Sequence, residues 1–179
     1  MSLIVEDGSV VEGANTFLSL SDARSLANDY GLTISDSDPD ASIQLRQAYL
    51  ALINHEQQLQ GQRVSADQTG IYPRSGVEKN CFELASNVIP LEVKLAQIFQ
   101  VDAINSGAYE TNNTDSGDKL ASFEVVGAYK ESYQDDSNTR LNTTVQGVYN
   151  SLYPLTKAGK CGSSGYASIT REEFGFVGR

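Results

Sequence analysis

Residues 90–107 read Pro-Leu-Glu-Val-Lys-Leu-Ala-Gln-Ile-Phe-Gln-Val-Asp-Ala-Ile-Asn-Ser-Gly, and this stretch decides the fold. A helix is predicted to open at Pro90 and to close at Gly107, because proline suits a helix start and glycine the position after a helix end. Its apolar residues lie on more than one side; they are Val93, Ala96, Ile98, Phe99, Val101, Ala103 and Ile104. Several neighbours must cover such a helix. We therefore expect it to be central.

Two amphipathic helices are predicted before it. Ser19 followed by Asp22 is a capping-box-like start, and the first helix runs from there to Gly31. The second opens at Asp38, read as its N-cap with proline at the first helical position. Its apolar stripe consists of Leu45, Ala48, Tyr49, Leu52, Ile53 and Leu59. Gly61 ends this run. A helix from Asp38 to that point would be the longest of the domain, and we expect His55 on or near its polar edge.

Residues 62–88 lack a sustained period and contain the sequence Tyr-Pro-Arg-Ser-Gly-Val at positions 72–77. Proline biases the residue before it towards extended backbone, so Tyr72 is expected to be extended. One interpretation is a packed crossover loop with Tyr72 buried and Arg74 in a salt bridge. The other is a contact between subunits.

The second half changes character twice. Residues 110–118 are polar and are predicted to form a loop, whereas residues 120–133 alternate as a strand or hairpin would, with a break at Gly127. A fourth amphipathic helix is expected from the spacing of Leu141, Val145, Val148, Leu152 and Leu155. From residue 157 the chain is rich in glycine, with scattered aromatic residues.

The predicted fold is therefore mainly α. It has an extended N-terminal arm at residues 1–18 and a four-helix domain at 19–155, with a small β excursion near 120–133. An extended C-terminal arm follows at residues 156–179. Such an arm is too flexible to fold alone and too aromatic for a plain solvent tail, so we expect it to order on a partner surface.

The charge of the sequence argues against binding of nucleic acid. The net charge is −10, and residues 1–40 alone hold eight acidic residues and one base. Residues 156–179 are weakly basic, with four bases and two acids. Proteins that bind nucleic acid present a basic face, because neutralised phosphates release counterions and thereby supply affinity. This sequence presents the opposite.

The composition of the sequence indicates the cellular compartment in which the protein is made. Mean hydropathy is −0.31, no apolar run reaches the ~20 residues of a membrane span, and no signal peptide is visible, so we expect a protein made in a cytoplasm. Cys81 and Cys161 lie far apart without a nearby histidine, and two free thiols are expected. With a single histidine, no metal site is predicted.

The chain carries no recognisable catalytic motif. It lacks the nucleophile elbow, zinc-helix, phosphate-loop, dinucleotide-binding and calcium-loop patterns. We therefore expect neither an enzyme nor a cofactor.

Three blocks resemble the head-to-tail connector proteins of tailed bacteriophages, whose domain is sometimes labelled DnaT-like. The first comprises residues 4–8 (Ile-Val-Glu-Asp-Gly) and 13–23 (Gly-Ala-Asn-Thr-Phe-Leu-Ser-Leu-Ser-Asp-Ala). The second is residues 72–77, where the family usually shows tryptophan in place of Tyr72. The third is residues 89–97 (Ile-Pro-Leu-Glu-Val-Lys-Leu-Ala-Gln), and residues 129–133 match more loosely. The last 20 or so residues match no block of the family.

The resemblance implies a structural virion protein in the phage neck. Such proteins form a ring, twelvefold in this family, under the portal; the ring extends the channel for passing double-stranded DNA and gives the tail or next neck protein its docking surface. As interface residues we nominate Tyr72, Arg74, Tyr166, Phe174 and Phe176. As lumen residues we nominate Asp36, Asp38 and Asp40. The alternative function is binding of single-stranded DNA, as the DnaT-like label suggests.

Overall fold

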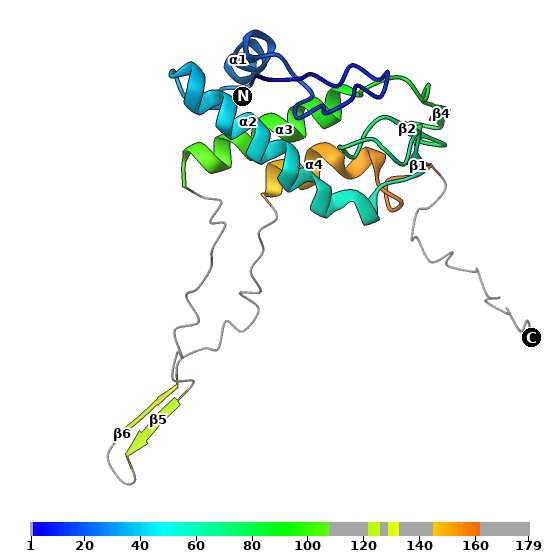
Figure 1. The fold of residues 1–179 in the computed structure, drawn as a ribbon. Coiled ribbons are helices and arrows are strands. Elements are labelled where there is room, and N and C mark those ends of the chain that lie inside the picture. The colour runs from blue at the N-terminus through cyan, green and yellow to red at the C-terminus, as the bar shows by residue number, and fades with distance from the viewer. Residues whose placement is uncertain (1, 108–121, 126–128, 133–144, 162–179) are drawn as a thin grey trace, which may run out of the picture.

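The structure, a computed structural model, describes residues 2–107, 122–125, 129–132 and 145–161 (Figure 1). Its helices are α1 (Leu20–Asp29), α2 (Asp38–Leu52), α3 (Leu91–Asn105) and α4 (Gln146–Leu152), and the 3₁₀ helices η1 (Ile53–Gln58) and η2 (Tyr153–Leu155) follow α2 and α4. The strands are β1 (Gln62–Arg63), β2 (Arg74–Ser75), β3 (Glu78–Lys79), β4 (Phe82–Glu83), β5 (Ser122–Val125) and β6 (Tyr129–Ser132). The predicted class, mainly α with a small β excursion, is confirmed.

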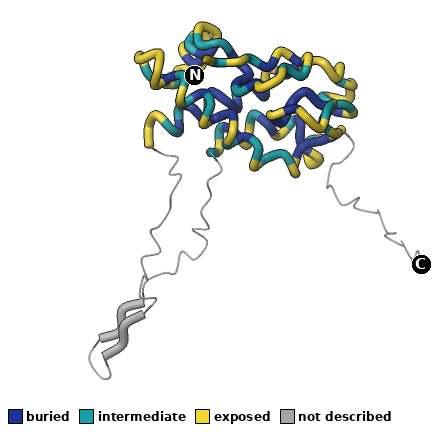
Figure 2. The backbone as a smooth tube through the Cα atoms, in the orientation of Figure 1, coloured by how far each residue is buried: buried dark blue, intermediate teal, exposed yellow. Residues whose placement is uncertain are grey.

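Helix α3 is central, as predicted. It packs against α1, α2 and α4, and Figure 1 shows it crossing behind α2. Two clusters of buried side chains flank it. One joins Phe17 and the C-terminal half of α2 to α4 and the loop at residues 71–77, and the other joins α1 to α2 and α3. Figure 2 shows this buried core running along the middle of the domain.

The first helix follows its sequence signals. The Ser19 side chain accepts a hydrogen bond from the backbone N–H of Asp22, the geometry of an N-cap. Gly31 follows the helix with a φ of 66°, in the left-handed region that glycine adopts without a steric cost. Helix α3 ends in the same way at Gly107, with a φ of 71°.

The second helix differs from the prediction at both ends. Its N-cap is Ser37 rather than Asp38, and the Ser37 carbonyl accepts the first helical hydrogen bond from Ala41. The α-helix stops at Leu52, and residues 53–58 continue as the tighter η1. It is therefore not the longest helix, since α2 and α3 both have 15 residues. His55 lies in η1, where burial lowers the pKa of its imidazole.

Residues 62–88 contain two small hairpins that the sequence did not predict. Strand β1 pairs antiparallel with β2, and β3 with β4. Each strand has only two residues, which is too short for an alternating pattern to be seen. The predicted hairpin is confirmed, because β5 pairs antiparallel with β6, while its turn at Gly127 lies outside the described residues.

The fourth helix is confirmed in its second half. Val148, Leu152 and Leu155 are buried against the core, as their spacing predicted. The expected start at Leu141 lies outside the described residues. Among the residues described, no helix is both long enough and apolar enough to cross a membrane.

The N-terminal segment, predicted as an extended arm, packs back on its own domain. A parallel bridge joins Val5 to Thr16, and Ala14, Phe17 and Leu18 are buried. At Gly8 the backbone has a φ of 106°, and a Cβ added there would lie 2.0 Å from the carbonyl oxygen of Asn87. Only glycine allows this approach. The segment is therefore part of the core.

Glu6 organises this segment from inside. Its side chain is buried, and its carboxylate accepts hydrogen bonds from the backbone N–H groups of Gly8, Val10 and Val11 at 2.8, 3.1 and 3.0 Å. These bonds hold Val10 at a φ of 63°, a conformation that a β-branched residue rarely adopts. The carboxylate thus replaces the partners that the loop backbone cannot find in regular structure.

Replacing Glu6 with alanine should therefore destabilise the fold. The expected loss in the free energy of unfolding is about 2–4 kcal/mol, because three backbone donors lose a charged acceptor. The matched control is Asp7→Ala, which removes the neighbouring exposed carboxylate and should change the free energy of unfolding much less. Urea unfolding followed by circular dichroism measures both. Equal losses in the two variants would contradict this role for Glu6.

Candidate functional site

The three sequence blocks at residues 4–23, 72–77 and 89–97 meet in one unit of the fold. The link is Gln97, fully buried on α3. Its side-chain oxygen accepts the backbone N–H of Phe17 at 3.0 Å, and its side-chain nitrogen donates to Thr16 Oγ1 at 3.0 Å and to the Leu45 carbonyl at 2.9 Å. One amide therefore ties the first block to the third and to α2. The second block contributes Tyr72 and Val77 to the buried apolar cluster that also contains Phe17 of the first block and Val93 of the third.

The loop at residues 71–77 is built around Arg74. Its buried guanidinium donates to the carbonyls of Gln60, Gly61 and Ile71 and to the Glu56 carboxylate at 3.2 Å. The Tyr72–Pro73 peptide bond is cis. Tyr72 is buried too, and burial raises the pKa of its phenol. The interpretation as a packed crossover loop is thus confirmed.

Glu56 completes this arrangement as the shared acceptor of two arginines. Arg63 binds it with two hydrogen bonds, at 2.6 and 2.5 Å, and Arg74 adds a third contact. The hydrogen bonds from Arg63, together with the charges of both guanidinium groups, hold the pKa of the Glu56 carboxyl below its ordinary 4.5. The Glu56 carboxylate therefore stabilises the loop only while it is ionised.

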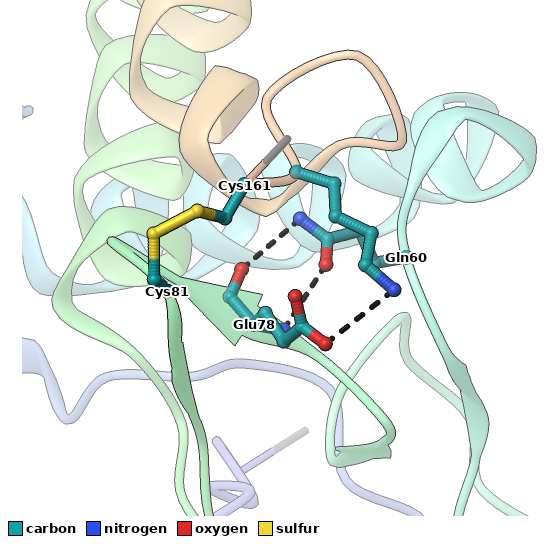
Figure 3. The surroundings of a disulfide bond; sticks show 5 residues. Gln60, Glu78, Cys81 and Cys161 are labelled. Carbon is teal, nitrogen blue, oxygen red and sulfur yellow. Dashed lines mark hydrogen bonds and ion pairs between the residues drawn. A yellow bond between two sulfur atoms is a disulfide. The ribbon is translucent and has the colours of Figure 1, made fainter. Parts of the chain in front are cut away.

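A second junction ties the hairpins to the end of the described chain (Figure 3). The buried Gln60 side chain exchanges hydrogen bonds with the backbone of Glu78, at 3.1 and 3.0 Å, and donates to the Thr156 carbonyl at 2.9 Å. Lys160 forms an ion pair with Glu78 at 3.4 Å. These contacts fix the base from which residues 162–179 depart.

A disulfide between Cys81 and Cys161 closes this junction (Figure 3). The expectation of two free thiols is therefore wrong. The reason is topological: the two cysteines are 80 residues apart, and only the packing of η2 against the β3–β4 hairpin brings their Cα atoms to 5.1 Å. Neither cysteine spacing nor composition carries that information.

The nominated site residues fall into three groups. Tyr72 and Arg74 lie inside the chain, so they can affect an interface only through the loop that they hold. Asp36, Asp38 and Asp40 are exposed at the start of α2, where Asp38 pairs with Arg24 at 2.7 Å. Carboxylates in the first turn of a helix interact favourably with the helix dipole, so Asp38 and Asp40 help to stabilise the start of α2. The remaining three, Tyr166, Phe174 and Phe176, lie outside the described residues.

The described surface is acidic, and most of its bases are engaged. Residues 2–107 and 145–161 hold 14 acids and eight bases, a net of −6. Five of these bases form ion pairs with carboxylates; they are Arg24, Arg63, Arg74, Lys79 and Lys160. The exception to the acidic character is the segment 145–161, which contains two lysines and no acid. Within the described parts, no cluster of residues suits a metal ion.

Exposed apolar side chains are the surface feature that sequence reasoning missed. Tyr149 and Tyr153 are neighbours on α4 and η2, with ring centroids 6.0 Å apart. Ile43 and Leu50 are exposed on α2. The sequence could have indicated that Ile43 and Leu50 are exposed, because both residues fall outside the apolar stripe that predicts the buried face of α2.

Loss of the disulfide should lower the stability of the native state. A closed loop of this length is worth about 4 kcal/mol by the chain-entropy relation, and that is the expected loss for the double variant Cys81→Ser/Cys161→Ser compared with the air-oxidised protein. Guanidinium unfolding measures it. Alkylation before and after reduction checks the bond itself: thiols that react fully in the oxidised, unreduced protein would contradict it.

The low pKa of Glu56 gives a pH signature. Its contribution to stability is fully present above the ordinary pKa of 4.5 and is lost as the pH falls through the lower folded value. Glu56→Gln should therefore melt well below the wild type at pH 7, and the gap should shrink below about pH 4.5. The control is Glu83→Gln, at an exposed carboxylate, whose gap should stay small throughout. A Glu56 gap that is constant with pH would refute the assignment.

Comparison with known proteins gives one match. A family model described as "Putative DnaT-like ssDNA binding protein" matches residues 1–172, nearly the whole chain. None of the curated proteins matches the chain, and neither does any solved structure. The family match confirms the DnaT-like part of the resemblance. The chain therefore belongs to this DnaT-like family.

Proposed function

We propose that this protein is a structural head-to-tail adaptor of a tailed bacteriophage. In this role it assembles with itself into a ring under the portal, extends the DNA channel, and offers the tail or next neck protein a docking surface. The observation that carries the proposal is the resemblance of the three blocks to connector proteins. This resemblance supports the proposal more strongly because the three blocks form one unit of the fold. They are joined by the hydrogen bonds of Gln97 and by the apolar cluster that contains Phe17, Tyr72 and Val93.

The charge of the described surface supports the same function. A channel wall that must let DNA pass should not bind phosphate, and an acidic wall repels it. Residues 2–107 and 145–161 carry a net charge of −6, and five of their eight bases form ion pairs with carboxylates. The exposed Asp36 and Asp38 are the part of this surface that we assign to the lumen.

Binding of single-stranded DNA is the second candidate function, and the description of the family favours it. Proteins of that kind combine a basic groove with aromatic residues on which bases stack. On this chain, the acid-free segment 145–161 with its exposed tyrosines is the described place that comes nearest to such a groove. The acidic surface elsewhere weakens the attraction of any nucleic-acid strand.

The two functions separate in one pair of measurements. Purified protein is mixed with the portal of the same phage and imaged in negative stain, and anisotropy of a labelled oligothymidylate is titrated with the protein at low salt. The adaptor predicts a ring seated on the portal and weak oligonucleotide binding. Tight oligonucleotide binding that falls steeply with salt, together with no ring on the portal, would replace the adaptor by the second function.

A further inference from the structure

The exposed face of α2 carries an unusual line of residues. Asp40, Ile43, Gln47 and Leu50 are all exposed, and their spacing of three and four places them on one face. We name this line the α2 stripe. Ile43 is 45% exposed and Leu50 is 63% exposed. The solvent face of a surface helix is ordinarily charged or polar, so two large apolar residues on it indicate a contact surface.

The exposed face of α4 and η2 carries a second line. It consists of Tyr149 on α4, Tyr153 on η2 and Lys157, which lies two residues beyond the end of η2, and we name it the α4 stripe. The tyrosines are 37% and 44% exposed and lie against each other at an interplanar angle of 52°. Lys157 is exposed as well, and its ammonium group donates to the Gln57 carbonyl at 2.9 Å, which fixes its position.

We propose that the α2 stripe of one copy of this chain binds the α4 stripe of the next copy. The two lines complement each other in antiparallel orientation. Asp40 then lies towards Lys157, and Ile43 and Leu50 lie over the pair formed by Tyr153 and Tyr149. The line on α2 is about 15 Å long, since each of the ten steps from Asp40 to Leu50 rises about 1.5 Å.

Charge complementarity selects a second copy as the occupant. The α2 stripe begins with the exposed carboxylate of Asp40, and the α4 stripe ends with Lys157 in the segment 145–161, which has no acidic residue. A carboxylate of one copy thus meets the ammonium group of another. Tyrosine is also enriched where protein interfaces are buried, because its ring is large and its hydroxyl tolerates water.

This contact deepens the adaptor function, on which it rests, by naming the surfaces that join the subunits. Because the two stripes differ, the contact is heterologous: every pair of copies leaves one α2 stripe and one α4 stripe available for further copies. Repetition of such a contact closes into a ring when its rotation divides the circle.

The test uses the full chain and two double variants. Ile43→Ser/Leu50→Ser damages the α2 stripe, and Tyr149→Ser/Tyr153→Ser damages the α4 stripe. Association is measured by sedimentation velocity, alone and with the portal. Each variant alone should associate about tenfold more weakly than the wild type, or worse. An equimolar mixture of both should form pairs and nothing larger, since each variant keeps one intact stripe.

The control is Val64→Ser/Val88→Ser, which removes two similarly exposed apolar residues elsewhere and should associate as the wild type does. Thermal unfolding checks that every variant is folded. The contact is overturned if both stripe variants associate normally, or if their mixture fails to pair. It is also overturned if the tyrosine variant loses only oligonucleotide binding. A wild-type chain that never associates, even on the portal, would instead overturn the adaptor function itself.

Discussion

The fold depends on one buried amide. Gln97 lies in the middle of the central helix, and its side chain is surrounded by apolar residues, so each of its hydrogen-bonding groups needs a partner within the protein. It finds them in the N-terminal segment and in α2. This requirement fixes the position of residues 16–17 against α3. It thereby also places the loop that Glu6 organises, which reaches the backbone at Asn87.

The buried polar groups of this chain hold backbone rather than substrate. Glu6, Gln60, Arg74 and Gln97 make most of their hydrogen bonds with backbone carbonyls and N–H groups. A fold of short helices joined by irregular segments needs such partners, because those segments lack the regular pairing of sheets and helices. Such internal anchoring of irregular segments is consistent with the adaptor function that we propose.

The sequence predicted the helices well because their signals are local. The Ser19 cap, the stops at Gly31 and Gly107, and the apolar circumference of α3 each act within a few residues. The two-residue strands, the change to η1 after Leu52 and the disulfide were not predictable, since they depend on contacts between distant segments. The candidate site divides in the same way. Burial of Tyr72 and Arg74 could be expected from their loop. The exposed Tyr149 and Tyr153 fall outside the apolar spacing of their helix, and nothing local in the sequence marks them as a surface pair.

The central claim is that this DnaT-like chain is a subunit of the phage neck. An electron cryomicroscopy map of the neck of the virion tests it most directly. If this chain is a subunit of the neck, the map contains a ring of this fold directly under the portal, with α2 of one copy against α4 of the next and with Asp36 and Asp38 towards the channel. A neck map in which every density is explained by other proteins, with no place for this fold, would contradict it.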